Sequence, residues 1–227
     1  MADMKLLSIN CRGLNNYDKR LALYDWLNTS KCDIVFLQET HYVSTKQTIY
    51  DSRWHGSSFH NFSESSHSKG VSILFNKSFS FKTVNIHKSA DSRILLMNIE
   101  HDNNIITLVN TYAPNSENLR IEFFKKVIKW ISKFTMNDEN IIFVGDLNCK
   151  VYNDRDKGGK IINDLVQRFS LVDMWNMIKP EKQCLTWCDG NGSPKSRIDY
   201  VFISKSFCYT PENIYIVVKP QMFQVLD

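Results

Sequence analysis

The chain has 227 residues, of which 43% are hydrophobic and 12% aromatic, and its formal net charge at pH 7 is +4. This composition is typical of a folded domain and excludes intrinsic disorder, while so small a charge neither requires nor excludes a polyanionic partner. No apolar run approaches the roughly 18 residues of a membrane span, and the N-terminus lacks a secretory pattern, so we expect neither a transmembrane nor a secreted protein.

Short apolar runs recur along the chain, and each predicts a strand with at least one buried face because it is rich in Val, Ile, Leu or Phe. In chain order these runs are 5–10, 33–38, 70–75, 93–99, 105–112, 140–145, 197–203 and 214–218. The polar stretch at 57–69 lies between the second and third runs and predicts an exposed loop.

Apolar residues at helical spacing predict three helices. The first lies around Leu21–Leu27, the second starts at Ser116 and reaches Phe134, and the third covers Ile161–Phe169. So many strands with so few helices do not fit a regular βαβ alternation. We predict an α+β fold, a four-layer sandwich of two packed, mostly antiparallel sheets flanked by helices. Without an internal repeat or a long linker, residues 1–227 are expected to form one domain.

The cysteines show no disulfide framework. Cys184 and Cys188 are the closest pair, but no second Cys or His pair follows them, so we expect no zinc site. Reduced, mostly buried thiols are the simpler interpretation, and they favour an intracellular location. The six cysteines are Cys11, Cys32, Cys149, Cys184, Cys188 and Cys208.

Three acidic residues stand at or inside predicted strands. Glu39 follows the run 33–38, Asp146 follows 140–145, and Asp199 lies within 197–203. Carboxylates at strand ends can meet at one edge of a sheet, and Mg²⁺ is held by one or two carboxylates together with waters and substrate phosphate oxygens. Alternatively, each acid is a solvated turn residue. By pattern alone, that alternative is the commoner one for any single residue.

Three amides accompany these acids. Asn10 ends the first run, Asn115 follows a Tyr-Ala-Pro segment, and Asn148 lies two residues after Asp146. An amide can orient a phosphate or an attacking water without adding negative charge. Turn formation is the usual role of asparagine, and by pattern alone it remains the favoured interpretation.

Seven sequence blocks favour functional roles for these acids and amides over turn formation. Together the blocks resemble the exonuclease–endonuclease–phosphatase superfamily, and they occur in the same order along the chain as in that family. They are similar above all to its retrotransposon branch of apurinic-like endonucleases, for which LQETH, YAPN and RIDY are typical. The resemblance covers nearly the whole chain and implies a DNase I-like fold. The blocks are SINCRGL at 8–14, LQETH at 37–41, GVSILF at 70–75, NTYAPN at 110–115, GDLNC at 145–149, LTW at 185–187 and SRIDYVFIS at 196–204.

The resemblance implies a magnesium-dependent phosphodiesterase, with Mn²⁺ as the alternative ion. Glu39 matches the principal metal ligand of the family, and Asn10 matches an amide that helps to hold the metal and phosphate. Asp146 matches the residue that positions or activates the attacking water. Asp199 matches the carboxylate that orients a terminal histidine of the family.

The same resemblance assigns substrate contacts. Tyr112 matches an active-site tyrosine whose hydroxyl contacts the phosphate, and Asn115 and Asn148 match amides that contact phosphate oxygens. Trp187 matches the wall beside a flipped-out or distorted nucleotide. Arg155 is expected to contact the DNA backbone, although an ordinary surface arginine is an equally good interpretation.

The match breaks at a Ser-Asp-His motif that ends the family sequence. The six histidines here all lie at or before His101, and His41 is a poor substitute because it flanks the expected metal ligand. Asp227, assigned as a metal-site residue, aligns weakly with the Asp of that motif. We therefore expect that the last strand and histidine are missing, through truncation or degeneration, and that the chain cleaves little or not at all. The retained metal-site residues favour truncation.

Three functions follow as hypotheses. The leading one is a DNA endonuclease whose nick leaves a 3′-hydroxyl for target-primed reverse transcription. A non-catalytic nucleic-acid-binding remnant and a phosphatase or phosphodiesterase acting on a small substrate are the alternatives. The resemblance also implies DNA as a partner, a reverse transcriptase domain downstream in the full-length element, a monomeric state and a nuclear location.

Overall fold

The computed structural model describes residues 4–136, 140–178, 185–188 and 193–207. Their strands form two large sheets and one small one. The four-stranded sheet has the order β1-β2-β4-β3, the six-stranded sheet the order β5-β6-β7-β8-β12-β9, and β10 pairs with β11. Most pairings are antiparallel, but β1 runs parallel to β2, and β7 parallel to β8.

The bounds of the elements are as follows. The strands are β1 (Leu6–Asn10), β2 (Ile34–Gln38), β3 (Ser57–Asn61), β4 (Val71–Phe75), β5 (Lys82–Lys88), β6 (Ile94–His101), β7 (Asn104–Tyr112), β8 (Ile141–Asp146), β9 (Leu171–Asp173), β10 (Trp187–Cys188), β11 (Pro194–Ser196) and β12 (Asp199–Ser204). The helices are α1 (Tyr17–Thr29), η1 (Ser44–Lys46), α2 (Gln47–Asp51), α3 (Glu117–Phe134), α4 (Lys157–Arg168), α5 (Met174–Ile178) and η2 (Lys205–Phe207).

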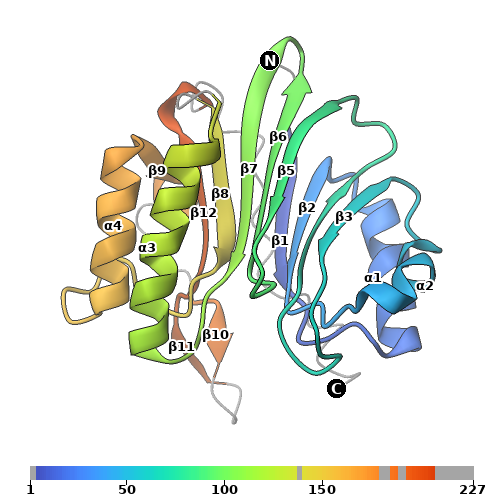
Figure 1. Cartoon of the computed structure of the whole chain (residues 1–227), viewed down its shortest axis with the longest axis horizontal. Helices are drawn as coiled ribbons and strands as arrows, with labels where there is room; N and C mark the ends of the chain where they lie inside the picture. Colours follow the sequence, from blue (N-terminus) through green and yellow to red (C-terminus); the bar gives the residue numbers. More distant parts are fainter. Residues whose placement is uncertain (1–3, 137–139, 179–184, 189–192, 208–227) are drawn as a thin grey trace.

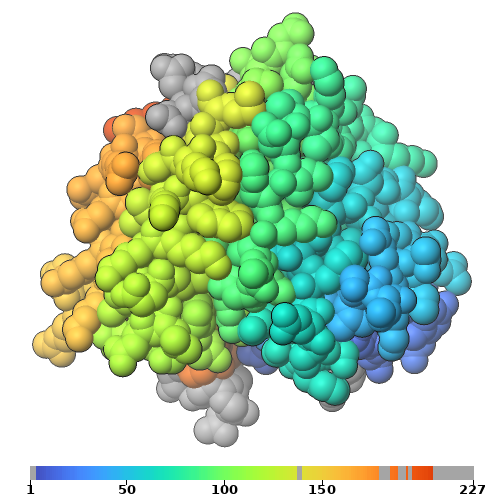
Figure 2. Space-filling model, in the orientation of Figure 1, coloured from blue at the N-terminus to red at the C-terminus, as the bar shows by residue number. Residues whose placement is uncertain are grey.

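The two large sheets pack face to face, with helices on their outer faces. Figure 1 shows α3 and α4 outside the six-stranded sheet and α1 and α2 outside the four-stranded sheet. The space-filling view shows the N-terminal half, in blue and green, and the C-terminal half, in yellow and orange, as two sides of one surface (Figure 2). The four-layer sandwich predicted from the sequence is therefore confirmed. Among the described residues, no helix is both long and apolar enough to cross a membrane.

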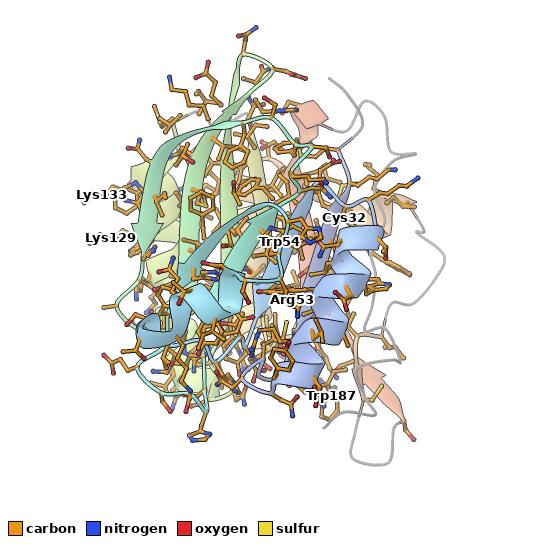
Figure 3. The ribbon with its side chains drawn as sticks, turned by 90° about the vertical axis from the view of Figure 1, so that its right-hand side faces the viewer. Cys32, Arg53, Trp54, Lys129, Lys133 and Trp187 are labelled. Carbon is orange, nitrogen blue, oxygen red and sulfur yellow. The ribbon has the colours of Figure 1, made fainter. Side chains whose placement is uncertain are left out.

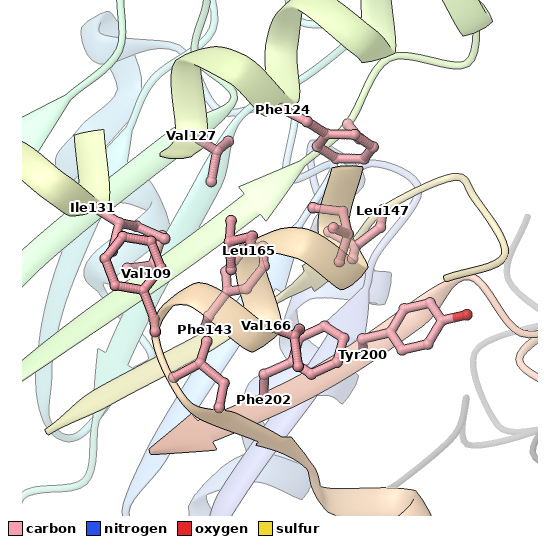
Figure 4. Packing of buried hydrophobic residues seen from close by; sticks show 14 of the residues in the cluster. Val109, Phe124, Val127, Ile131, Phe143, Leu147, Leu165, Val166, Tyr200 and Phe202 are labelled. Atoms are coloured by element: carbon pink, nitrogen blue, oxygen red, sulfur yellow. The ribbon is translucent and has the colours of Figure 1, made fainter. Parts of the chain in front are cut away.

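Apolar residues fill each interface between these layers. Under α3 and α4, side chains such as Phe124, Val127 and Leu165 meet Phe143 of the six-stranded sheet (Figure 4). A second cluster lies between the two sheets, and a third lies under α1. These three layers of buried apolar area are the main driving force for the fold.

The expectation of an exposed loop at Ser57–Lys69 is wrong over its first five residues, which form β3. Hydrogen bonds explain why so polar a sequence pairs with β4. His60 Nδ1 lies 2.7 Å from Ser72 Oγ, and Asn61 Nδ2 donates to the carbonyl oxygen of Ile94 at 2.9 Å. Both side chains are buried with their polar atoms satisfied, which sequence periodicity does not reveal. The predicted strand at 214–218 lies outside the described residues.

Candidate active site

The two sheets end at a common rim, at the lower end of Figure 1. The strand ends bring five of the predicted residues together there. Asn10 ends β1, and Glu39 directly follows β2, which is parallel to β1. Tyr112 and Asp146 end the parallel strands β7 and β8 as register partners, and Asp199 opposite them begins β12. Parallel strands deliver their C-terminal ends to the same edge, so distant sequence positions meet at this rim.

The Asn10 side chain joins the two sheets across the rim. Its Nδ2 donates to Glu39 Oε1 and to Asp146 Oδ2, each at 2.7 Å. Its Oδ1 accepts the backbone N–H of Arg12 at 3.0 Å, which orients the amide. One neutral amide thus holds two carboxylates together without cancelling their charge.

Glu39 is a partly buried carboxylate surrounded by donors. Burial raises its pKa, but hydrogen bonds from His41, Asn10 and Tyr112 outweigh burial, so the net pKa of Glu39 lies below its ordinary value. His41 Nε2 lies 3.7 Å from Glu39 Oε2. Glu39 also has a φ of +50°, a backbone conformation that costs about 1–3 kcal/mol for a residue other than glycine and is common at functional sites.

Asp146 is the most buried carboxylate of the rim, with 4% of its surface exposed. Its pKa lies well above the ordinary value, first because of burial and then because Asp199 stands opposite it, while Asn10 and the N–H of Asn148 partly offset both. The negative charge of the neighbouring carboxylates Glu39, Asp146 and Asp199 favours either protonation of one of them or the binding of a cation. Such a site has a clear physical reason to bind a metal.

Tyr112 hydrogen bonds to Glu39, and Arg93 packs against the tyrosine ring. Burial and the carboxylates of Glu39 and Asp146 raise the pKa of Tyr112, so the phenol stays protonated and can donate. The Arg93 guanidinium lies 4.7 Å from the centre of the tyrosine ring and donates to the Tyr112 carbonyl at 3.1 Å. Sequence reasoning missed Arg93, because it is only the first residue of an apolar run. His41 was considered there and set aside, although it contacts Glu39.

The two remaining amides lie beside the rim. Asn148, with a φ of +49°, donates its backbone N–H to Asp146 Oδ1 at 3.0 Å and its Nδ2 to the carbonyl of Ala113 at 2.8 Å. Asn115 is exposed, and its carbonyl accepts from Arg120 Nη1 at 2.8 Å. Asn148 therefore touches the carboxylate site directly, whereas Asn115 lies on the loop that leads into α3.

Two other predicted residues, Trp187 and Arg155, lie on a hairpin and a loop, and one lies outside the described residues. Trp187, 39% exposed, stands on the β10–β11 hairpin, near the lower end of the view in Figure 3. Arg155 is exposed on the loop between β8 and α4. Asp227 lies outside the described residues.

The donor set at the rim fits a hard divalent cation. Across the described part of the chain, no group of three or more His, Cys, Asp or Glu side chains gathers as a ready-made metal cage. Zinc and calcium sites use such cages, whereas Mg²⁺ keeps most of its waters and takes one or two carboxylates. The Glu39 carboxylate, whose pKa is lowered, is a suitable ligand for that ion, and the Asp146 carboxylate is held close to it by the shared Asn10 amide.

Comparisons with known proteins agree with this geometry. A model described as the Endonuclease/Exonuclease/phosphatase family matches residues 7–217. The chain is also 27% identical over 227 residues to the Transposon TX1 uncharacterized 149 kDa protein of Xenopus laevis; the match covers 96% of this chain and 17% of that protein. The chain therefore spans about a sixth of the length of this relative.

Solved structures with a similar fold include two enzymes. An AP endonuclease from Archaeoglobus fulgidus superposes with a TM-score of 0.69 at 17% identity, covering 87% of this chain and 86% of that one. The 3′ phosphatase NExo from Neisseria, bound to a product DNA hairpin, superposes with a TM-score of 0.67 at 16% identity over 88% and 86% of the two chains. At such low identities these likenesses show the fold.

Proposed function

Because the chain belongs to the endonuclease/exonuclease/phosphatase family, a family of hydrolytic enzymes, we propose that it is a divalent-metal-dependent DNA endonuclease. The observation that carries this proposal is the bridge at the rim, where Asn10 holds Glu39 and Asp146 together at 2.7 Å each. A metal-dependent phosphodiesterase can use carboxylates to hold the metal and to accept a proton, together with neutral donors for the phosphate.

Asp146 is proposed as the group that accepts a proton from the attacking water. A carboxylate whose pKa is raised by burial and by Asp199 is a stronger base than an exposed one. Its Oδ2 accepts from Asn10 and its Oδ1 from the N–H of Asn148, so its orientation is fixed before substrate arrives. In this proposal the negative charge of Asp199 raises the pKa of the base, Asp146. This role is additional to the one expected from the resemblance, the orientation of a histidine.

The neutral donors are proposed to bind the phosphate. The protonated Tyr112 hydroxyl and the amides of Asn148 and Asn115 donate without repelling a phosphodiester. Glu39 and Asn10 would hold Mg²⁺, or Mn²⁺ in its place, and the bound ion would supply positive charge opposite the phosphate oxygens. Trp187 and Arg155 would extend the contact along the DNA.

We further propose that the chain is the endonuclease domain of a LINE-type retrotransposon. The transposon relative supports this origin, and its much greater length leaves room for other domains. A nick with a 3′-hydroxyl would then prime a reverse transcriptase carried by the same element, and the target would be nuclear DNA. The likeness to a phosphatase structure bound to a DNA hairpin fits DNA as the substrate.

A plasmid assay tests this function. Supercoiled DNA is incubated with the chain in Mg²⁺ or EDTA, beside a soluble phosphate ester, with the Asp146→Asn variant as the matched control. We expect nicking that needs Mg²⁺ and is lost in the variant, with ends that a polymerase extends without phosphatase treatment.

The other outcomes decide against the endonuclease. If the chain shifts DNA on a gel but never nicks it, even in long incubations, it is a binding remnant. Hydrolysis of the soluble ester with no nicking would instead mark a small-molecule phosphodiesterase. Nicking that persists in EDTA or in Asp146→Asn would exclude the proposed site.

A further inference from the structure

Most of the interface between the two sheets is apolar. On this interface Phe36, Ile73 and Phe75 of the four-stranded sheet meet Met97 and Leu108 of the six-stranded sheet. Apolar contacts are not directional, so by themselves they constrain the relative position of two sheets less sharply than hydrogen bonds do. The candidate active site needs that position fixed, because it takes residues from both sheets.

A pair of fully buried amides interrupts this apolar interface. Gln38 Nε2 donates to Asn110 Oδ1 at 2.8 Å, and neither side chain has any exposed surface. Asn110 Nδ2 in turn donates to the carbonyl oxygens of Leu37 at 3.0 Å and Ser72 at 2.8 Å. One asparagine of the six-stranded sheet is thereby fastened to both β2 and β4 of the other sheet.

The position of this pair along the chain links it to the site. Gln38 is the residue before Glu39, and Asn110 lies two residues before Tyr112 on β7. Gln38 Nε2 also lies 3.2 Å from Ser8 Oγ on β1, two residues before Asn10. The same pair is thus tied to the three strands that deliver Asn10, Glu39 and Tyr112 to the rim.

We propose that Gln38 and Asn110, here called the sheet clamp, are positioning residues that hold the two sheets in the register at which the rim carboxylates share Asn10. The proposal rests on the proposed function for its biological meaning. A buried amide pair without this role would affect stability alone. If the pair is a clamp, its removal must also change the geometry of the rim, although the rim lies one or two residues further along these strands.

A double variant with a matched control separates these roles. Gln38→Met with Asn110→Leu removes both partners of the central hydrogen bond and roughly keeps their shape, which limits the loss of stability to the donor missing from the Leu37 and Ser72 carbonyls. The control is Asn98→Leu. Asn98 is also buried, but its Nδ2 donates to the carbonyl of Phe134 and its Oδ1 accepts from Thr107, so it ties the six-stranded sheet to α3 and not to the other sheet.

Mn²⁺ binding, followed by electron paramagnetic resonance, is the first measurement. In the double variant we expect Mn²⁺ affinity to fall by roughly ten- to a hundredfold, the usual effect of removing groups that orient metal ligands, with kcat for nicking falling alongside and KM for DNA unchanged. Asn98→Leu should keep the affinity of the unmodified chain, whatever its own melting temperature.

A crystal structure of the double variant is the second measurement and does not depend on activity or metal. We expect the contact between Asn10 Nδ2 and Asp146 Oδ2, 2.7 Å in the unmodified chain, to be lost. A folded double variant that keeps this contact overturns the clamp, as does an equal loss of Mn²⁺ affinity in Asn98→Leu. If the unmodified chain itself neither binds Mn²⁺ nor nicks DNA, the proposed function fails, and the crystal structure alone judges the clamp.

Discussion

Single side chains at the rim do several tasks at once, and Asn10 is the clearest case. It donates to two carboxylates from different sheets and accepts a backbone N–H. Aspartate in its place would put a third negative charge between Glu39 and Asp146, and leucine would leave both carboxylates without their shared donor. The residue type therefore follows from the electrostatics of its neighbours.

Replacing this amide gives the first prediction. Asn10→Leu is expected to lower the Mg²⁺-dependent nicking rate by about a hundredfold or more, the usual effect of removing one donor that organises a reacting centre. The rate on supercoiled plasmid measures the effect. Asn28→Leu, on α1 and away from the rim, is the control and should nick like the unmodified chain. Equal rates for the two variants would remove Asn10 from the site.

The sequence located this site only in part, for a reason visible at single residues. Strand-end positions identified Glu39 and Asp146 as candidates, but pattern alone could not separate ligands from turn residues, and the family resemblance supplied that decision. Arg93 has no sequence signal at all, because its role comes from lying over the Tyr112 ring. Contacts between residues far apart in the chain can be recognised only once the three-dimensional fold is known.

At the scale of elements, β8 shows how a strand is shaped to present its last residue. Gly145 pairs with Thr111 of β7, and a Cβ on Gly145 would lie 2.1 Å from the carbonyl oxygen of Thr111. The parallel pair β7–β8 can therefore close tightly just before Tyr112 and Asp146 only because this position has no side chain.

Gly145→Ala should thus push β7 and β8 apart. We expect it to lower the free energy of unfolding by roughly 1–3 kcal/mol, as overpacking of a close contact does, and to reduce nicking as well. Urea denaturation and the plasmid assay measure the two effects. A variant as stable and as active as the unmodified chain would show that the strands accommodate a methyl group and that glycine is not required there.

The strand that sequence periodicity failed to find, β3, depends on a polar network. Asp51 at the end of α2 accepts from Ser58 Oγ at 2.6 Å and lies 2.8 Å from His60 Nε2, while Nδ1 of the same ring reaches Ser72 of β4. Burial raises the pKa of Asp51, but hydrogen bonds from His60 and Ser58 outweigh it, so the net pKa is lowered.

This lowered pKa predicts a pH-dependent stability. A carboxylate with a folded pKa below its unfolded value stabilises the fold above the unfolded pKa, near 4, and loses that contribution as the pH falls through the folded value. The stability difference between the unmodified chain and Asp51→Asn should therefore be largest at pH 7 and shrink below about pH 4. Urea midpoints across that range test it, with exposed Asp164→Asn as the control; a difference that stays constant would contradict the prediction.

At the scale of the whole molecule, the apolar runs predicted seven of the described strands and the layered architecture, because strands buried on both faces carry a strong hydrophobic signal. β3 and β5 were missed for the opposite reason. β5 is an edge strand with most of its residues exposed, and it carries Lys82 and Lys88 at its ends. This polar composition protects the edge from pairing with another chain, and it also leaves no hydrophobic pattern by which the sequence could reveal the strand.

The placement of the site between two sheets couples cation binding to global stability. Burial and Asp199 raise the folded pKa of Asp146, so this group stabilises the fold only at low pH, and the contribution is lost as the pH rises through the folded value. At a pH above that folded value, and without metal, the ionised Asp146 should therefore weaken the fold. Asp146→Asn removes that charge, and we expect its melting temperature in EDTA to exceed that of the unmodified chain.

Mg²⁺ should reverse this order. A ligand that binds only the folded state at a hundred times its Kd stabilises by about 2.7 kcal/mol, so the melting temperature of the unmodified chain should rise when EDTA is replaced by Mg²⁺. Glu39→Gln, which loses the ionised carboxylate proposed to hold the ion, should show almost no such rise. Calorimetry of the three proteins in both buffers measures these shifts. Because the carboxylates at the rim come from both sheets, equal melting temperatures with and without Mg²⁺ would mean that no cation joins them.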